Sequence, residues 1–312
     1  MEIIMEKLAY FFIDDTIWVM RDLTRQHPRS LFDNPFMKML KKGHDDFGMT
    51  VQLNLFYRTD FFYGDDEFTL SEMTDAYKSE FEEASSWLKL AFHAKQEFPD
   101  YPYVNATYED VKSNYNAIVN EIKRFAGEKS IAYAVCPHWL PVSRAGCKAL
   151  ADCGVKFISP SFGDVEEYTG DESALPYGHA ARLLTNRQPE TKLYTRKTKD
   201  LRISASICAY NHISGEQRAE IFGKNTSIYD EETGLCFRAL GGGPCLNLNT
   251  VDSIAETLAL LNGNEFIGTA THEQYFYPDY YNYQPDYAEK FYCLGRILKE
   301  YGYRFITADE LK

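Results

Sequence analysis

The sequence predicts an α/β fold in which parallel strands form a barrel that carries one β-rich insertion. Strand-like and helix-like segments alternate along most of the chain, and this order favours parallel strands joined by right-handed crossovers. The first apolar run, 10–13, reads Tyr-Phe-Phe-Ile without polar interruption, as expected of a strand buried on both faces. The length of 312 residues suits a single barrel domain over 1–312 with an insertion.

The elements before the insertion follow from periodicity and from residues that end helices. The segment 107–125 places Val111, Tyr115 and Ile118 on one helical stripe, and Gly127 ends it. Gly43 and Gly48 are expected to close a helix at 36–40 in the same way. We expect strands at 10–16, 49–57, 87–92, 131–135 and 155–159, and helices at 17–24, 36–40, 107–125 and 143–152, with a further helix that begins near 70.

The regular order breaks from about residue 160 to 247. This segment contains strand-like runs at 202–208 and 235–240, and we interpret it as an insertion built on short strands. Strands so few and short cannot support a core of their own, so the insertion is expected beside the mouth of the barrel. Regular order returns with a helix at 251–261, a strand at 265–271, a helix at 286–301 and a strand at 303–307.

Composition and charge exclude several classes of partner. Hydrophobic residues make up 45% and charged residues 25% of the chain, which is typical of a globular enzyme. The net charge of -13 argues against nucleic acids and acidic membranes, whose phosphates require a cationic surface. We see neither a signal peptide nor an apolar run of membrane-spanning length. The seven cysteines lack Cys-x-x-Cys spacing, so we expect reduced thiols and a cytoplasmic location, and the oligomeric state stays open.

Polar residues follow the ends of four predicted strands. A barrel gathers such strand ends at one rim, where (β/α) barrels carry their active sites. A carboxylate with several imidazoles is a normal set of zinc ligands, and three protein ligands with one open position are typical of a catalytic zinc. Taken singly, each histidine is more often structural, and adjacent aspartates are also common in turns. The residues concerned are Asp14, Asp15, His93, His138, His272 and Glu273.

These residues resemble the motifs of the polysaccharide deacetylase superfamily, carbohydrate esterase family four, whose fold is an irregular seven-stranded (β/α) barrel. Phe12-Ile13-Asp14-Asp15 is similar to the family's Thr-Phe-Asp-Asp motif, which implies that Asp14 is the catalytic base and Asp15 a metal ligand. His93 matches the first histidine of a His-x-x-x-His motif, whose second position is Glu97 here. His272 matches a histidine that ends a late strand and acts as the acid.

The third metal ligand follows from a departure from that pattern. Cys136-Pro137-His138-Trp139 stands where the family has an Arg-Pro-Pro-Tyr type of motif, so the arginine that braces the base is missing and a histidine is present. We prefer His138 as the third ligand, with Glu97 as the alternative. The resemblance implies a divalent metal, zinc by preference, and a hydrolase that removes an acyl group from an N-acylated sugar or a related small amide.

Aromatic residues near these motifs are candidates for substrate binding. Trp139, Tyr275 and Tyr277 could present flat rings to a sugar face. The alternative for the tyrosine-rich segment 275–283 is a loop that packs against the barrel and covers its mouth.

Two other functions remain open at this point. One is a metal-free glycoside hydrolase, in which two carboxylates flank a glycosidic bond. Its carboxylates would come from Asp14, Asp15, Glu97 and Glu273. The other is a carbohydrate-binding barrel that has lost catalysis. A measurement of bound metal would distinguish the glycoside hydrolase from a deacetylase. A measurement of turnover would distinguish the inactive binding barrel from a deacetylase.

Overall fold

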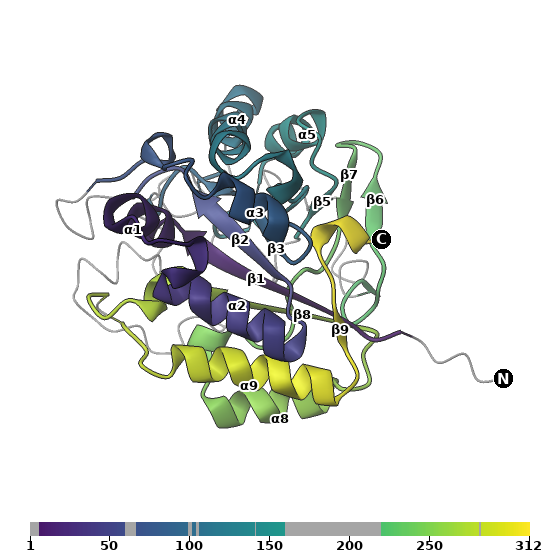
Figure 1. Ribbon diagram of the computed structural model, residues 1–312. Coiled ribbons are helices and arrows are strands. Elements are labelled where there is room, and N and C mark those ends of the chain that lie inside the picture. Colours follow the sequence, from purple (N-terminus) through teal and green to yellow (C-terminus); the bar gives the residue numbers. More distant parts are fainter. Residues whose placement is uncertain are drawn as a thin grey trace.

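The computed structural model describes residues 6–59, 67–98, 102–103, 106–140, 142–159, 220–280 and 282–312. Two sheets lie at the centre, with helices packed around them (Figure 1). In the view of Figure 1, α4 and α5 lie above the strands, and α8 and α9 lie below them. The α/β class with a parallel sheet is therefore confirmed.

The larger sheet is parallel throughout. Its strands run in the order β3-β2-β1-β8, and β9 pairs with the beginning of β1. The central strand β1 is buried at each of its nine positions, as its uninterrupted apolar run predicts. The five strands are β1 (Leu8–Thr16), β2 (Val51–Phe56), β3 (Leu88–Ala94), β8 (Phe266–His272) and β9 (Arg304–Phe305).

The second sheet has the order β4-β5-β7-β6 and consists of short strands, β4 (Ala134–Val135), β5 (Phe157–Ile158), β6 (Ile228–Asp230) and β7 (Leu235–Phe237). Two isolated parallel bridges connect further segments to the larger sheet. Leu90 of β3 pairs with Ile131, which precedes β4, and Ala270 of β8 pairs with Cys245, which follows β7. A continuous seven-stranded barrel is not shown, because the strands are divided between two sheets. The predicted strands at 131–135 and 155–159 contain regular strands of only two residues each.

Most helices agree with the predicted ones in place, although several differ in length. The helix predicted to begin near residue 70 does not: a 3-10 turn spans Leu70–Glu72, and the α-helix begins only at Lys78. The first turn of α4 is closed by a capping box between Thr107 and Asp110. Gly43 lies inside α2 instead of ending it, because α9 packs so closely there that a β-carbon on Gly43 would collide with Phe291. The α-helices are α1 (Trp18–Gln26), α2 (Pro35–Phe47), α3 (Lys78–Ala84), α4 (Tyr108–Phe125), α5 (Arg144–Asp152), α8 (Val251–Leu261) and α9 (Tyr287–Glu300).

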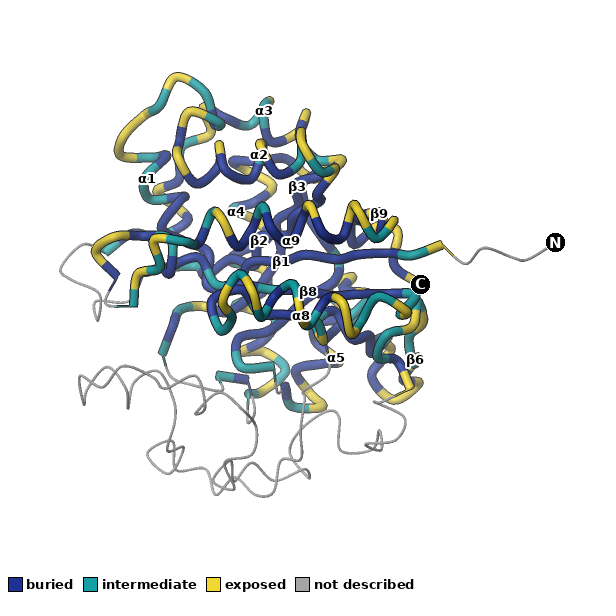
Figure 2. Tube along the Cα trace, turned by 90° about the horizontal axis from the view of Figure 1, so that it is seen from below, coloured by how far each residue is buried: buried dark blue, intermediate teal, exposed yellow. Residues whose placement is uncertain are grey.

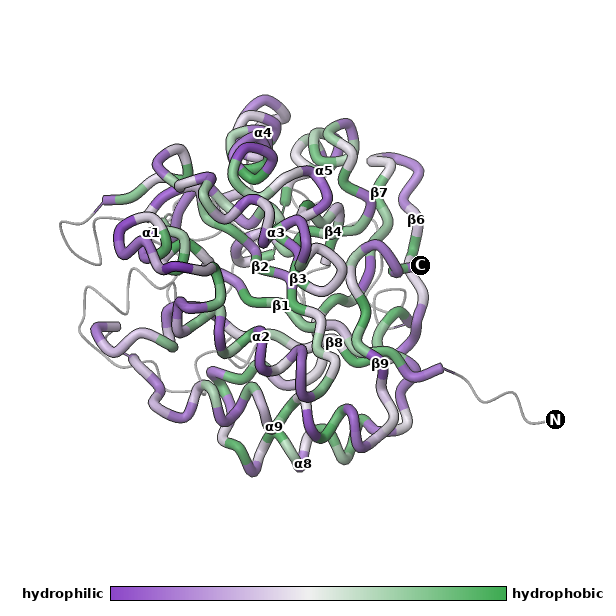
Figure 3. Tube along the Cα trace, viewed as in Figure 1, coloured by the Kyte–Doolittle hydropathy of each residue, from purple (hydrophilic) through white to green (hydrophobic). Residues whose placement is uncertain are grey.

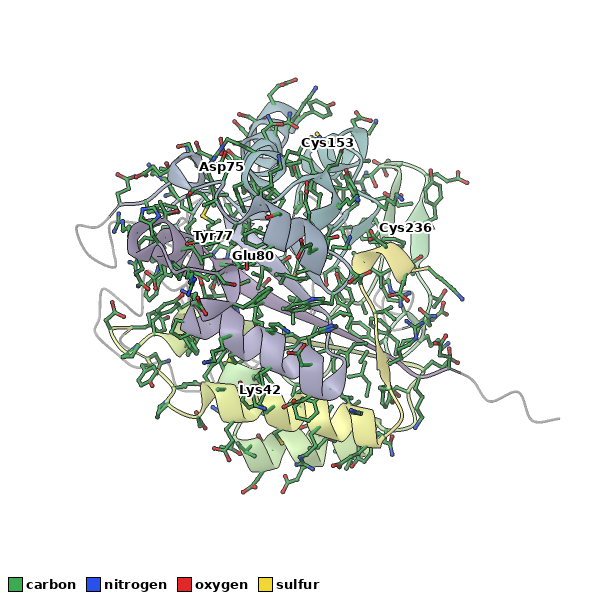
Figure 4. All side chains as sticks on the ribbon, viewed as in Figure 1. Lys42, Asp75, Tyr77, Glu80, Cys153 and Cys236 are labelled. Atoms are coloured by element: carbon green, nitrogen blue, oxygen red, sulfur yellow. The ribbon has the colours of Figure 1, made fainter. Side chains whose placement is uncertain are left out.

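Short 3-10 helices connect these elements: η1 (Leu31–Asp33), η3 (Leu70–Glu72), η4 (Glu128–Ser130), η8 (Leu246–Leu248), η9 (Glu273–Phe276) and η10 (Ala308–Glu310). Two residues labelled in Figure 4 fix the connection between α1 and α2. The Tyr77 hydroxyl donates to Pro28 O at 2.6 Å, and Glu80 accepts from Leu31 N at 3.0 Å. No helix within the described ranges is both long and apolar enough to cross a membrane.

The alternation of side chains along β1 separates two apolar cores. Ala9, Phe11 and Ile13 belong to the large core between the sheet and the helices, whereas Tyr10 and Phe12 belong to a smaller inner core. Figure 2 shows the central strands as buried, and Figure 3 shows apolar residues gathered along β1. Position 14 continues the inner face, so the strand pattern itself directs Asp14 toward the inner space.

The predicted insertion is described only in part. Residues 160–219, which include the predicted strand at 202–208, lie outside the described residues. The predicted strand at 235–240 is present as β7, which pairs in parallel with β5 and antiparallel with β6. The single domain with an insertion remains a prediction.

Candidate metal centre

A bulge at the end of β1 brings both aspartates to the same side. Strict alternation would turn Asp15 outward with Ile13, but the register of β1 against β2 shifts between Ile13 and Thr16. Asp15 has φ 59, a left-handed conformation that costs a non-glycine residue about 1–3 kcal/mol and that aspartate tolerates better than most. The backbone thus turns Asp15 to His93, near the end of β3, and to His138, which follows β4.

Three ligand atoms converge at this strand end. Asp15 Oδ1 lies 3.0 Å from His93 Nε2 and 3.1 Å from His138 Nδ1, and the two nitrogens are 3.1 Å apart. All three residues are buried, and they form a group that could hold a metal ion. Tetrahedral ligands about 2.0–2.1 Å from zinc are separated by about 3.3 Å, so the spacing fits a metal of this size.

The outer ring nitrogens determine which atoms face the centre. His93 Nδ1 donates to Cys136 O at 2.5 Å, and His138 Nε2 donates to Glu97 O at 3.0 Å. A carbonyl oxygen only accepts, so both neutral rings carry their lone pairs on the inner nitrogens. The inner nitrogens and Asp15 Oδ1 are then three acceptors facing one another, an arrangement that a cation stabilises. Outer hydrogen bonds of this kind are typical of metal-bound histidines.

The second oxygen of Asp15 is also held. Gln274 Nε2 donates to Asp15 Oδ2 at 2.8 Å. Burial opposes ionisation of Asp15, but when the inner ring nitrogens carry protons instead of a cation, the charge of His138 and the hydrogen bonds from His138 and His93 hold the pKa of its carboxyl well below the ordinary value. A bound cation would replace those protons and stabilise the same ionised form. Asp15 is therefore an ionised carboxylate, as a metal ligand must be.

Glu97, the alternative third ligand, lies behind His138. Its Oε1 is 3.9 Å from His138 Nε2, the ring nitrogen that faces away from Asp15. The group that could hold a metal contains His138 and not Glu97. The geometry thus favours His138 as the third ligand, while the role of each residue remains a prediction.

Asp14 lies next to the centre without belonging to it. Asn54 Nδ2 donates to Asp14 Oδ1 at 2.6 Å, and His93 Nδ1 is 3.6 Å from the same oxygen. Burial raises the pKa of Asp14, although His93 acts in the opposite direction. A buried carboxylate with a raised pKa is a stronger base than an exposed one.

His272 lies directly across the sheet from Asp14, since the two residues are partners in the pairing of β1 with β8. Asn247 Oδ1 is 3.0 Å from His272 Nδ1, so Nδ1 donates there and Nε2 is left to exchange a proton. His272 is partly exposed, unlike the three convergent residues. Sequence reasoning did not identify Asn247, because η8 and β8 are distant in the chain.

The predicted aromatic contacts divide into two groups. Trp139 is partly exposed, and its ring centroid is 5.9 Å from that of His138. Tyr275 in η9 and Tyr277 immediately after it are both buried. Tyr275 packs against Tyr280, and Tyr277 packs against Trp18. Burial argues against sugar stacking by these two tyrosines and favours the packing alternative, so only Trp139 remains a candidate contact.

Glu273 is a structural residue. Its carboxylate accepts hydrogen bonds from the backbone N–H groups of Ile17 at 2.7 Å, Trp18 at 2.9 Å and Val19 at 2.6 Å, which are the first donors of α1. Burial raises the pKa of Glu273 to about 7, while the N–H donors act in the opposite direction. A fully buried carboxylate engaged by three donors cannot flank a substrate, so Glu273 is not part of a glycosidase pair.

A small pocket opens beside Asp15. Its interior volume of about 10 Å³ has room for about one water molecule. Its walls combine the polar groups around the centre with apolar side chains of α1 and β2. The lining residues are Asp15, Ile17, Trp18, Phe56, Arg58, Thr59, Glu97 and Gln274.

Comparisons with known proteins give a likeness of fold and no family. No protein-family model matches the chain, and no curated protein matches it. The 4-alpha-glucanotransferase from Thermococcus litoralis is similar at 14% identity and a TM-score of 0.53, over 98% of this chain and 40% of that chain. The Xyl-CE4 domain of a multidomain xylanase from the hindgut metagenome of Trinervitermes trinervoides is similar at 12% identity and a TM-score of 0.40, over 98% and 89%. The first likeness shows a shared fold, and the second carries no argument.

Proposed function

We propose that the chain is a metal-dependent hydrolase that removes an acyl group from an N-acylated sugar or a related small amide. The observation that carries the proposal is the convergence of Asp15 Oδ1, His93 Nε2 and His138 Nδ1, with both outer ring nitrogens bound to backbone carbonyls. Three acceptors without a donor between them suit a divalent cation, and carboxylate with imidazole suits zinc.

The residues around this centre suit amide hydrolysis. The metal, when bound, would polarise the substrate carbonyl and acidify a water molecule. Asp14 would accept a proton from the attacking water as the new carbon–oxygen bond forms. His272 Nε2 would deliver a proton to the nitrogen as the carbon–nitrogen bond breaks, so that the amine leaves neutral. The pairing of Asp14 with His272 across β1 and β8 supports this division of roles.

We also infer that seven parallel strands of the two sheets form one irregular barrel. These are β1, β2, β3, β4, β5, β7 and β8, whereas β6 and β9 lie outside it. The support is the pair of isolated bridges between Leu90 and Ile131 and between Cys245 and Ala270, which lie where such a barrel would close. An experimental structure in which ladder hydrogen bonds continue through both places would agree with a closed barrel.

A metal-free glycoside hydrolase is the second candidate, favoured only by the fold shared with the glucanotransferase. It requires two carboxylates on opposite sides of a glycosidic bond. Glu273 is engaged at the start of α1, and Asp15 faces two imidazoles, so two of its four carboxylates are poorly suited.

The test is to measure bound divalent metal in the purified protein before and after chelation, together with amine release from N-acetylated and N-formylated sugars. We expect about one metal per chain, loss of amine release on chelation and recovery with zinc. Glycoside cleavage that persists in the chelator would support the second candidate, and sugar binding without any turnover would support an inactive binding protein.

A further inference from the structure

We infer that Asn54 is a positioning residue for Asp14, and that a buried hydrogen-bond chain beginning at Tyr10 fixes the direction of its amide. The inference rests on the proposed function, because it takes Asp14 as the base. Asn54 lies on β2, and its side chain is fully buried beneath the candidate centre.

The chain of hydrogen bonds runs along the inner faces of β1 and β2. The Tyr10 hydroxyl donates to Gln52 Oε1, and Gln52 Nε2 donates to Asn54 Oδ1 at 2.7 Å. Asn54 Nδ2 then donates to Asp14 Oδ1 at 2.6 Å. Tyr10, Gln52 and Asn54 are each at most 2% exposed, so water does not compete for these bonds.

One backbone carbonyl sets the direction of the whole chain. Gln52 Nε2 also donates to Ala134 O at 3.0 Å, and a carbonyl can only accept. The Gln52 nitrogen must therefore face both Ala134 and Asn54, so Asn54 presents its oxygen to Gln52 and its nitrogen to Asp14. A reversed Asn54 amide would set oxygen against the Asp14 carboxylate and nitrogen against the Gln52 nitrogen, which are two repulsive contacts.

Asp14 depends on this donor because other strong donors are absent around it. Within the described part of the chain, no lysine or arginine lies at salt-bridge distance from Asp14, and the His93 Nδ1 proton is directed to Cys136 O. The thiol of Cys136 is 4.0 Å from Asp14 Oδ2. Asn54 thus holds Oδ1 in place, whereas Oδ2 accepts only the long, weak hydrogen bond from the Cys136 thiol and can take a proton.

The test compares Asn54→Ala and Gln52→Met with Thr50→Val. Thr50 precedes β2, and its hydroxyl donates to Ile306 O at 2.6 Å, so Thr50→Val loses a buried hydrogen bond away from Asp14. We expect Asn54→Ala to retain its metal and its KM and to lose about 10²-fold in kcat, the scale of a misplaced catalytic group. Gln52→Met should lose less, because Asn54 remains but its amide is no longer fixed. Thr50→Val should keep wild-type kcat.

A crystal structure of Asn54→Ala gives a readout that does not depend on activity. We expect the Asp14 carboxylate to leave its wild-type position while Asp15, His93 and His138 keep theirs. If the wild-type protein hydrolyses no amide, the proposed function fails, and this structure still tests the positioning. An unmoved Asp14, a kcat equal to that of Thr50→Val, or a loss confined to KM would overturn the inference. If Asn54→Ala does not fold, the same criteria apply to Gln52→Met.

Discussion

Buried charged groups lie both where the strands β1, β2 and β3 begin and where they end, and the two groups are stabilised in different ways. At the end where the strands begin, Lys89 Nζ donates to Lys129 O at 2.9 Å and pairs with Asp309 at 2.6 Å. At the end where the strands finish, Asp15, His93 and His138 bring three acceptors together. The first arrangement is complete within the protein, whereas the second is a group that could hold a metal ion.

We interpret the Lys89 charge as structural and the acceptor cluster as the candidate functional site. Where the strands begin, Lys89 is buried, and Leu8, Ile306 and Leu311 belong to the buried inner core. The opposite end has a pocket and a partly exposed histidine, His272. Chemistry at the carboxyl ends of parallel strands and stability at the other ends is the pattern of parallel α/β barrels.

The largest expected effect comes from breaking the acceptor cluster itself. Asp15→Ala should lose its metal and all measurable amide hydrolysis, because it removes the only carboxylate of the set. The affinity for zinc should fall by more than the roughly 10–100-fold that loss of an outer hydrogen-bond partner costs. Glu97→Ala is the matched control and should keep most of its metal. Metal analysis after gel filtration compares the two, and retention in Asp15→Ala with loss in Glu97→Ala would reverse our assignment.

The next prediction tests whether different residues at the carboxyl ends of the strands bind the metal and transfer the proton. His272→Ala should keep its metal and fold and lose amide hydrolysis by about 10²–10⁴-fold, the range of a general acid. Substrates with better leaving groups should lose less, since they need little protonation. A variant without metal would make His272 a ligand, and a fully active one would remove it from the mechanism.

A third, smaller effect concerns stability at the start of α1. Glu273→Ala removes a carboxylate that three backbone N–H groups share, so the free energy of unfolding should fall by about 2–4 kcal/mol. Urea denaturation followed by circular dichroism measures this. Asp22→Ala in the same helix is the control and should change stability much less. A loss of activity in Glu273→Ala without a loss of stability would contradict the structural role.

The smallest effect on stability is expected at Lys89, whose charge is already paired within the protein. Lys89→Met removes an ion pair with Asp309, whose side chain is 57% exposed, so the change in unfolding free energy should be about 1 kcal/mol or less. Amide hydrolysis and metal content should equal those of the wild type. Loss of metal in Lys89→Met would show that the two ends are coupled, and the comparison between them would fail.

The sequence predicted the fold class and the residues of the candidate centre, because both depend on local patterns. Asp15, His93 and His138 end or follow apolar runs, so the pattern marked them as candidates. The choice of Asp15 over Asp14 as a ligand followed from the family resemblance. Asn54 and Asn247 were missed because their partners, Asp14 and His272, are distant in sequence. An asparagine inside a strand looks like ordinary alternation until the opposite strand is known.

Packing between distant segments also determined features that local sequence patterns could not predict. Gly43 resembled a helix end, and only the proximity of Phe291 explains why a glycine continues α2. The rings of Tyr275 and Tyr277 resembled a sugar-binding surface, but contacts with Tyr280 and Trp18 bury them. The strands β4 and β5 are shorter than their apolar runs, because a run marks burial and not the extent of pairing.

The most direct measurement is a crystal structure with anomalous diffraction collected at the zinc edge from protein reconstituted with zinc. Our account predicts one strong anomalous peak, bonded at about 2.0–2.2 Å to Asp15 Oδ1, His93 Nε2 and His138 Nδ1. Asp14 and Glu97 should lie outside the bonded set. A structure at saturating zinc with no anomalous peak between these three atoms would contradict the assignment.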